Sequence, residues 1–181
     1  MADALRNLVD SIVAATPGLP DPETLKSWSP AISGDLPLVI RSDGSWWHEG
    51  TRIQREGLVR LFASLLRREH DGEYYLVTPA EKWRVDVERH ALLGIDCDVT
   101  GSNGSSIWYV LLNTGGRCRI GGANQMHGEG EYGEPYLELP NGLTAQITRA
   151  AWYRLINAAT IDGDRVYITS QGKNVNLGST G

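Results

Sequence analysis

Two stretches of the sequence, PLVIRSDG (residues 37–44) and PYLELPNG (residues 135–142), share one outline. Each begins with proline, continues with apolar residues suited to a strand, and ends in Asp-Gly or Asn-Gly, which are typical of tight hairpin turns. The first predicts a strand over 36–41 that turns back into the short strand SWWH. The second predicts an equivalent hairpin, so one structural unit is expected to occur twice in the chain.

A helix is predicted after each hairpin. In the first copy Thr51 is expected to cap it, and its apolar stripe is formed by Leu58, Val59, Leu61, Phe62, Leu65 and Leu66. In the second copy the helix is expected over about 149–159. The alternative to a duplication is a chance match, because any two hairpin–helix–hairpin segments align when gaps are placed freely.

Two strands are predicted after each helix. In the first copy they span 74–78 and 82–88, and in the second they lie around Thr169 and Lys173. The predicted class is therefore α+β, with two small tandem domains that each contain a hairpin, a helix and a strand pair.

The predicted domain boundaries follow from this order. Residues 1–34 are expected to form a helix over 3–16 and a proline-rich linker, and residues 35–90 the first repeat domain. Residues 91–181 are expected to form the second domain, which holds an inserted hairpin over 92–112 as well as the second copy.

Composition narrows the class of protein. The 181 residues carry a net charge of -5, which argues against a nucleic-acid binder or a binder of anionic membranes. No apolar run approaches the roughly eighteen residues of a spanning helix, and no secretory signal is visible, so we expect a cytoplasmic protein. Cys97 and Cys118 lack a metal-binding spacing and are expected to be free thiols. The sequence indicates no cofactor and no metal.

The candidate binding residues lie in the first copy alone. Aromatic and ionisable side chains gather in its hairpin and around its last turn, where the second copy has smaller or neutral residues. Alternation along strands is expected to turn Trp46 with His48, and Lys82 with Arg84, toward one surface that suits an anionic planar ligand. The predicted ligand-binding set is Trp46, His48, Arg55, Glu81, Lys82, Trp83 and Arg84.

Structural roles remain open for these residues. A tryptophan in a strand is commonly half-buried, a histidine near a turn often meets a backbone carbonyl, and basic residues on an edge strand are often solvated. Familiar nucleophile, phosphate-loop and zinc motifs are absent from the sequence. An enzymatic role is therefore not favoured, and no catalytic residue is assigned.

Residues 35–88 resemble a known bacterial family. The elements DGxWxHxG, IxRxxLVRLF and LRRExDGxYxLVTPxEKW are long and specific, and they resemble the family catalogued as domain of unknown function 1285. The resemblance implies two duplicated α+β domains, the second like a pleckstrin-homology barrel. It also implies a groove for a nucleotide-like ligand and a role in signal transduction, but no catalytic residue.

Three hypotheses follow. The first is a regulatory protein that binds a nucleotide-like anion between the two repeats, with Arg55, Lys82 and Arg84 at the phosphate and an indole on the base. The second is a protein-interaction module that uses a strand edge or a barrel-like surface. The third, least favoured, is a hydrolase using His48 with Glu81 or Asp43.

Overall fold

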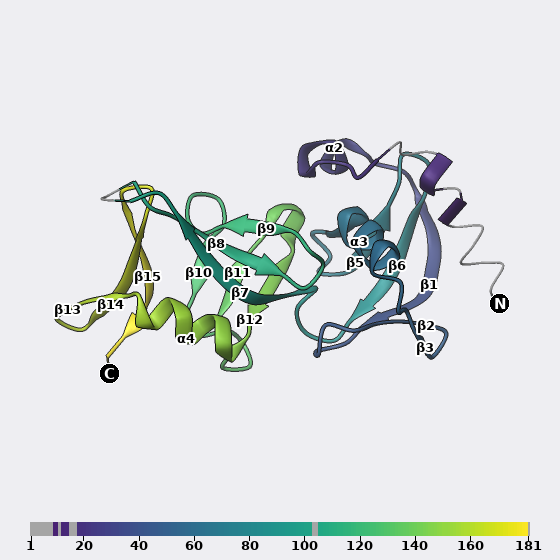
Figure 1. Cartoon of the computed structure of the whole chain (residues 1–181). Coiled ribbons are helices and arrows are strands. Elements are labelled where there is room, and N and C mark those ends of the chain that lie inside the picture. The colour runs from purple at the N-terminus through teal and green to yellow at the C-terminus, as the bar shows by residue number, and fades with distance from the viewer. Residues whose placement is uncertain (1–8, 11, 15–17, 103–104, 181) are drawn as a thin grey trace. The chain divides into compact units, whose positions relative to one another are not determined.

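The computed structural model describes residues 9–10, 12–14, 18–102 and 105–180. It divides the chain into two units, each described here by itself. The first ends at Glu88 and leaves out Ser42–Gly44, whereas the second includes Ser42–Gly44 and resumes at Arg89. Each unit contains a six-stranded sheet with a helix beside it (Figure 1). Within the described residues, no helix is both long and apolar enough to cross a membrane.

The strands of the first unit form one sheet in the order β3-β2-β1-β6-β5-β4. Strand β1 pairs antiparallel with β2 and parallel with β6. This parallel pair joins the antiparallel strands β3-β2-β1 to the antiparallel strands β6-β5-β4. The elements are α2 (Pro22–Ser27), β1 (Ile32–Ile40), β2 (Trp46–His48), β3 (Thr51–Arg52), α3 (Glu56–Leu65), β4 (Leu66–Arg68), β5 (Tyr74–Val77) and β6 (Lys82–Val87).

The two faces of the first sheet are covered by different helices. Helix α3 buries Phe62, whose ring stacks on Trp46 of β2 with a centroid separation of 6.4 Å. On the other face, Leu25 of α2 packs in a cluster with Tyr75 and Val77 of β5. Residues of both faces of β5 are therefore buried, which explains its continuous apolar sequence.

The second unit has a six-stranded sheet in the order β10-β11-β12-β7-β8-β9 and a separate three-stranded sheet, β13-β14-β15. The larger sheet is curled, and helix α4 packs beside β7 (Figure 1). The elements are β7 (Leu92–Thr100), β8 (Ile107–Leu112), β9 (Arg117–Arg119), β10 (Met126–His127), β11 (Tyr136–Glu138), η1 (Pro140–Gly142), β12 (Thr144–Ile147), α4 (Arg149–Asn157), β13 (Thr160–Asp162), β14 (Arg165–Ser170) and β15 (Lys173–Ser179).

The predicted order of hairpin, helix and strand pair is present twice. β1 with β2 and β11 with β12 are both antiparallel, a helix follows each pair, and an antiparallel strand pair follows each helix. The α+β class with two tandem domains is thereby confirmed. The strand pairs differ in their partners, since β6 joins β1 whereas β14 and β15 form their own sheet. The hairpin β7–β8 that the sequence analysis treated as inserted supplies the central strand next to β12.

Two local predictions were wrong. Thr51 lies in β3 rather than capping a helix, and α3 begins at Glu56 with no side-chain cap at Arg55. Part of the predicted linker is helical, because Asp21 accepts hydrogen bonds from two backbone N–H groups of α2 and proline occupies its first turn. In the predicted helix over 3–16, residues 9–10 and 12–14 are helical, and the others lie outside the described residues.

Replacing Gly94 by alanine is expected to lower the free energy of unfolding by about 1–3 kcal/mol. A Cβ atom there would lie 2.5 Å from Val110 Cγ1 and 2.8 Å from Ile147 Cδ1, so the centre of the second sheet would be overpacked. Urea unfolding followed by circular dichroism measures the change. The control is Gly57→Ala in α3, where a Cβ atom meets nothing within 4 Å. That variant is expected to gain about 0.5 kcal/mol, and equal stability of the two variants would contradict this account.

Candidate functional site

The predicted ligand-binding residues do not share one face of the first sheet. Val39 is paired with Trp47 on one side and with Asp86 on the other, so those three side chains share a face. Because side chains alternate along a strand, Lys82 and Arg84 lie on that face, whereas Trp46 and His48 lie on the opposite one. The surface that the sequence analysis expected them to form together is therefore not present.

Trp46 and His48 are core residues in the structure. Their exposed fractions are 1% and 7%, and both lie on the face of the sheet that α3 covers. The Nε1 of Trp46 is buried and has no hydrogen-bond partner. Neither side chain offers a surface on which a ligand can stack without a rearrangement of the core.

Each of the two predicted phosphate-binding cations on β6 has a carboxylate partner. Lys82 Nζ lies 3.0 Å from Glu69 Oε2, and Arg84 Nε lies 2.7 Å from Asp35 Oδ1. A ligand phosphate would have to compete with these carboxylates. Arg84 donates a hydrogen bond to Asp35, and this bond raises the pKa of Arg84, so that side chain stays cationic.

The other predicted residues are dispersed. Arg55 is exposed at the start of α3. Trp83 donates from Nε1 to Glu81 Oε2 over 3.4 Å, and its ring would lie 3.3 Å from a Cβ atom at Gly34. These contacts give Trp83 and Glu81 roles within the fold. Whether any of the seven residues contacts a ligand stays a prediction.

Glu69 is the centre of a charge network in the first unit. Its carboxylate accepts hydrogen bonds from Arg67 and Lys82, and Arg67 also donates to the backbone carbonyls of Leu25 and Trp28. Burial opposes ionisation of Glu69, but the two cationic donors outweigh it and lower its pKa. The network fastens α2 to β4 and β6.

Next to this network, Asp71 accepts a hydrogen bond from the Tyr75 hydroxyl, which raises the pKa of Tyr75 to about 12. The phenol therefore stays protonated at neutral pH.

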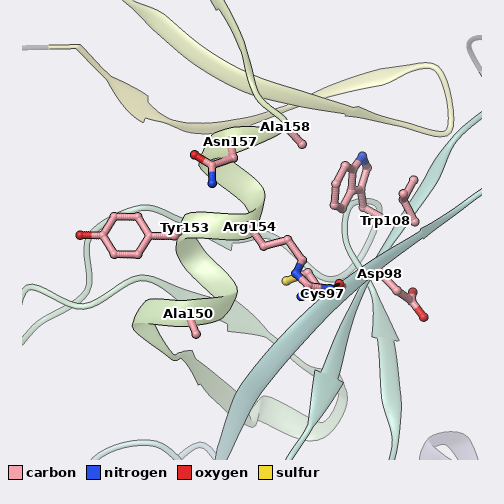
Figure 2. A pocket seen from close by; sticks show the side chains of 9 residues that line it. Cys97, Asp98, Trp108, Ala150, Tyr153, Arg154, Asn157 and Ala158 are labelled. Atoms are coloured by element: carbon pink, nitrogen blue, oxygen red, sulfur yellow. Dashed lines mark hydrogen bonds between the residues drawn. The ribbon is translucent and has the colours of Figure 1, made fainter.

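An open groove lies in the second unit between α4 and the strands β7 and β8. Its volume is about 630 Å³, within the range of roughly 300–1,000 Å³ found for ligand sites. Figure 2 shows Arg154 reaching from the helix toward β7, whereas Tyr153 and Asp98 turn away from the space between them. The lining residues are Cys97, Asp98, Val99, Trp108, Ala150, Tyr153, Arg154, Asn157 and Ala158.

Along this groove, strand β7 has an edge without a strand beside it in the described part of the chain. Strand β12 pairs with β7 only from Leu92 to Gly94, whereas β7 continues to Thr100. The change occurs because Thr148 leaves the sheet: its N–H donates to Gly94 O, and its hydroxyl accepts from Ala151 N as the cap of α4.

Side chains meet the backbone of Cys97 on that edge. Its N–H donates to Asp96 Oδ1 over 2.8 Å, and its carbonyl accepts from Arg154 Nη1 over 3.4 Å. Arg154 Nε also lies 3.1 Å from Asp96 Oδ1, which links the two side chains. The Cys97 thiol itself is inert at neutral pH, because burial raises its pKa to about 12.

A second polar cluster surrounds His90. Its Nδ1 lies 2.8 Å from Thr144 Oγ1 and its Nε2 lies 2.6 Å from Glu134 Oε1. Burial opposes ionisation of Glu134, but the hydrogen bond with His90 outweighs it and lowers the pKa of Glu134. Because both ring nitrogens of His90 are engaged, the ring has no nitrogen left for a substrate. No three histidine, cysteine or acidic residues converge as metal ligands in the described ranges.

The sequence analysis missed the groove residues. It placed Trp108 in the predicted hairpin over 92–112 and Arg154 in the predicted helix over about 149–159, and it gave neither residue a binding role. No local signal in the sequence marks these residues, because the end of β12 beside β7 is set by tertiary contacts.

Glu69→Gln is expected to lower the free energy of unfolding at pH 7 by about 1–2 kcal/mol, because it removes a partly buried partner of two cations. The folded pKa of Glu69 is below its unfolded value. The stabilisation is therefore complete above an unfolded pKa of about 4.3 and is lost as the pH falls through the folded pKa. Urea unfolding from pH 7 down to pH 3 measures this. The exposed Glu129→Gln is the control, and a difference that persists unchanged at pH 3 would refute the network's role.

Comparison with known proteins identifies relatives of the whole chain. A family model for the N-terminal domain described as "Domain of unknown function (DUF1285)" matches residues 23–90. A model for the C-terminal domain, described as "Protein of unknown function (DUF1285)", matches residues 91–177. No curated protein matches.

Two crystal structures are similar to the chain. A DUF1285 family protein from Silicibacter pomeroyi DSS-3 is 31% identical with a TM-score of 0.81, and the match covers 96% of this chain and 95% of that one. A DUF1285 family protein from Shewanella baltica OS155 is 30% identical with a TM-score of 0.55, covering 67% of this chain and 91% of that one. Together with the two family models, these matches show that the chain belongs to the DUF1285 family.

Proposed function

We propose that this chain is a regulatory binding protein that holds an extended peptide segment of a partner in the groove between α4 and β7. The observation that carries the proposal is the edge of β7 beyond Gly94, which lies beside the groove and has no strand next to it in the described residues. Addition of a strand to such an edge is a common mode of peptide recognition.

The backbone of β7 supports this mode. Cys97 directs its N–H and its carbonyl toward side chains of Asp96 and Arg154, on the side away from β8. Along an antiparallel strand, alternate residues direct their backbone groups to the same side, so those of Val99 face the same edge. A peptide laid along β7 therefore meets the backbone donors and acceptors of Cys97 and Val99, which lie two residues apart.

The groove beside this edge supplies apolar contacts for side chains. Val99 is 46% exposed, and Trp108, Ala150 and Ala158 line the same space. Every second side chain of an added strand would point toward these residues. Backbone pairing would thus provide affinity, and the groove would select which side chains fit.

A display library of eight-residue peptides is the direct probe. Selection on the wild-type protein is expected to enrich peptides with an apolar residue, and Trp108→Ala is expected to weaken their binding by at least about tenfold. Tyr153→Ala is the matched control, because this ring also belongs to the lining but points away from the groove (Figure 2). Isothermal titration calorimetry measures both variants.

N-methylation of the enriched peptides tests the backbone contacts separately from the folding of the variants. Methylation of an amide that pairs with β7 is expected to cost about 1 kcal/mol, whereas methylation of the next amide along the peptide is expected to cost little. Failure to enrich any peptide, or equal loss at every amide, would exclude strand addition.

A nucleotide-like anion is the second candidate for the same groove. Trp108 offers an indole for stacking and Arg154 a guanidinium for a phosphate, which is the chemistry that the sequence analysis expected from residues of the first copy for a ligand between the two repeats. This candidate is weaker, because it makes no use of the edge of β7 beyond Gly94, where no strand lies beside β7 in the described residues.

A thermal-shift screen of nucleoside monophosphates and cyclic dinucleotides tests it. A ligand at a hundred times its Kd is expected to add about 2.7 kcal/mol to the stability of the wild-type protein. The shift is expected to vanish in Arg154→Gln and to persist in Arg149→Gln. Unchanged unfolding temperatures across the screen would eliminate this candidate.

A further inference from the structure

Asp96 and Arg154 occupy the place that a neighbouring strand would take. In an antiparallel sheet, a partner residue accepts a hydrogen bond from one N–H and donates one to the carbonyl of the same residue. At Cys97 the acceptor is Asp96 Oδ1 and the donor is Arg154 Nη1. The pair, which we call the edge cover, thus satisfies the backbone of Cys97 in the absence of a strand.

The edge cover is held by contacts that a partner can replace. The side chains of Arg154 and Asp96 are 59% and 40% exposed, and an ion pair this open to solvent contributes little stability. Backbone groups of an added strand reproduce the two bonds to Cys97. Displacement then costs chiefly the contact between Asp96 and Arg154.

After displacement, the side chains of Asp96 and Arg154 lie in different surroundings. Asp96 is half exposed and can be hydrated once it is released. Arg154 lines the groove and extends from α4 toward β7 (Figure 2), so its guanidinium faces whatever fills that space. The carboxylate of Asp98 turns away from α4 in the same view and does not replace Asp96. An occupant that carries its own carboxylate restores the partner of Arg154.

We infer that the edge cover selects peptides with an acidic residue two positions from an apolar residue, because residues at that spacing share one face of a strand. The apolar side chain lies against Trp108 and Val99, and the carboxylate takes Arg154 from Asp96. The inference rests on the proposed function, since it describes the partner and the opening of the same groove.

The test compares enriched peptides with copies in which the acidic residue is changed to its amide. On the wild-type protein the amide form is expected to bind about tenfold more weakly, equivalent to about 1.4 kcal/mol. In Arg154→Gln the two forms are expected to bind equally. In Asp96→Asn, which keeps an acceptor for the Cys97 N–H but removes the competing charge, the acidic form is expected to bind severalfold more tightly than to the wild type.

Arg149→Gln is the control, because Arg149 lies on the same helix but is engaged with the Tyr153 hydroxyl. It is expected to keep the wild-type preference. If peptides bind through backbone contacts but the acidic and amide forms are equal on the wild type, the inference is wrong and strand addition stands. If neither the wild type nor Asp96→Asn binds any peptide, strand addition itself is wrong.

Discussion

The hydrogen bond from Thr148 N to Gly94 O fixes where the second sheet stops on one side of β7. Up to that point β12 runs parallel to β7, and after it the chain turns into α4 because the Thr148 hydroxyl caps the helix. The remaining residues of β7 are thereby placed beside a helix instead of a strand. Both the groove and the edge cover depend on this one change of direction.

An uncovered strand edge is a general hazard, because it can pair with any extended chain. Proteins commonly protect such edges with charged side chains or a covering segment, and Asp96 with Arg154 is a small example of that protection. Because both of these side chains are exposed, this protection is easily removed.

The two repeated hairpins and the helices α3 and α4 were predictable because their signals are local. Asp43-Gly44 and Asn141-Gly142 mark the turns, and the apolar stripe that contains Phe62 and Leu65 marks α3. Strand partners were not predictable, since β1 with β6 and β12 with β7 join residues far apart in the sequence. The central place of β7 was missed for that reason.

The candidate site was harder to predict than the fold. Trp46, His48, Lys82 and Arg84 have the residue types of a binding site, but pairing places them on two faces and gives the cations carboxylate partners. No local sequence motif marks Arg154 or Trp108 as a binding residue. Their importance follows only from the end of β12, which depends on tertiary contacts.

The buried Cys97 thiol that lines the groove affects how the protein responds to oxidants. Because burial raises its pKa to about 12, this thiol stays protonated at neutral pH. Peroxides and disulfides attack through the thiolate, so this sulfur resists sulfenylation and mixed-disulfide formation. The floor of the groove therefore keeps its shape through changes in redox state that would alter a surface thiol.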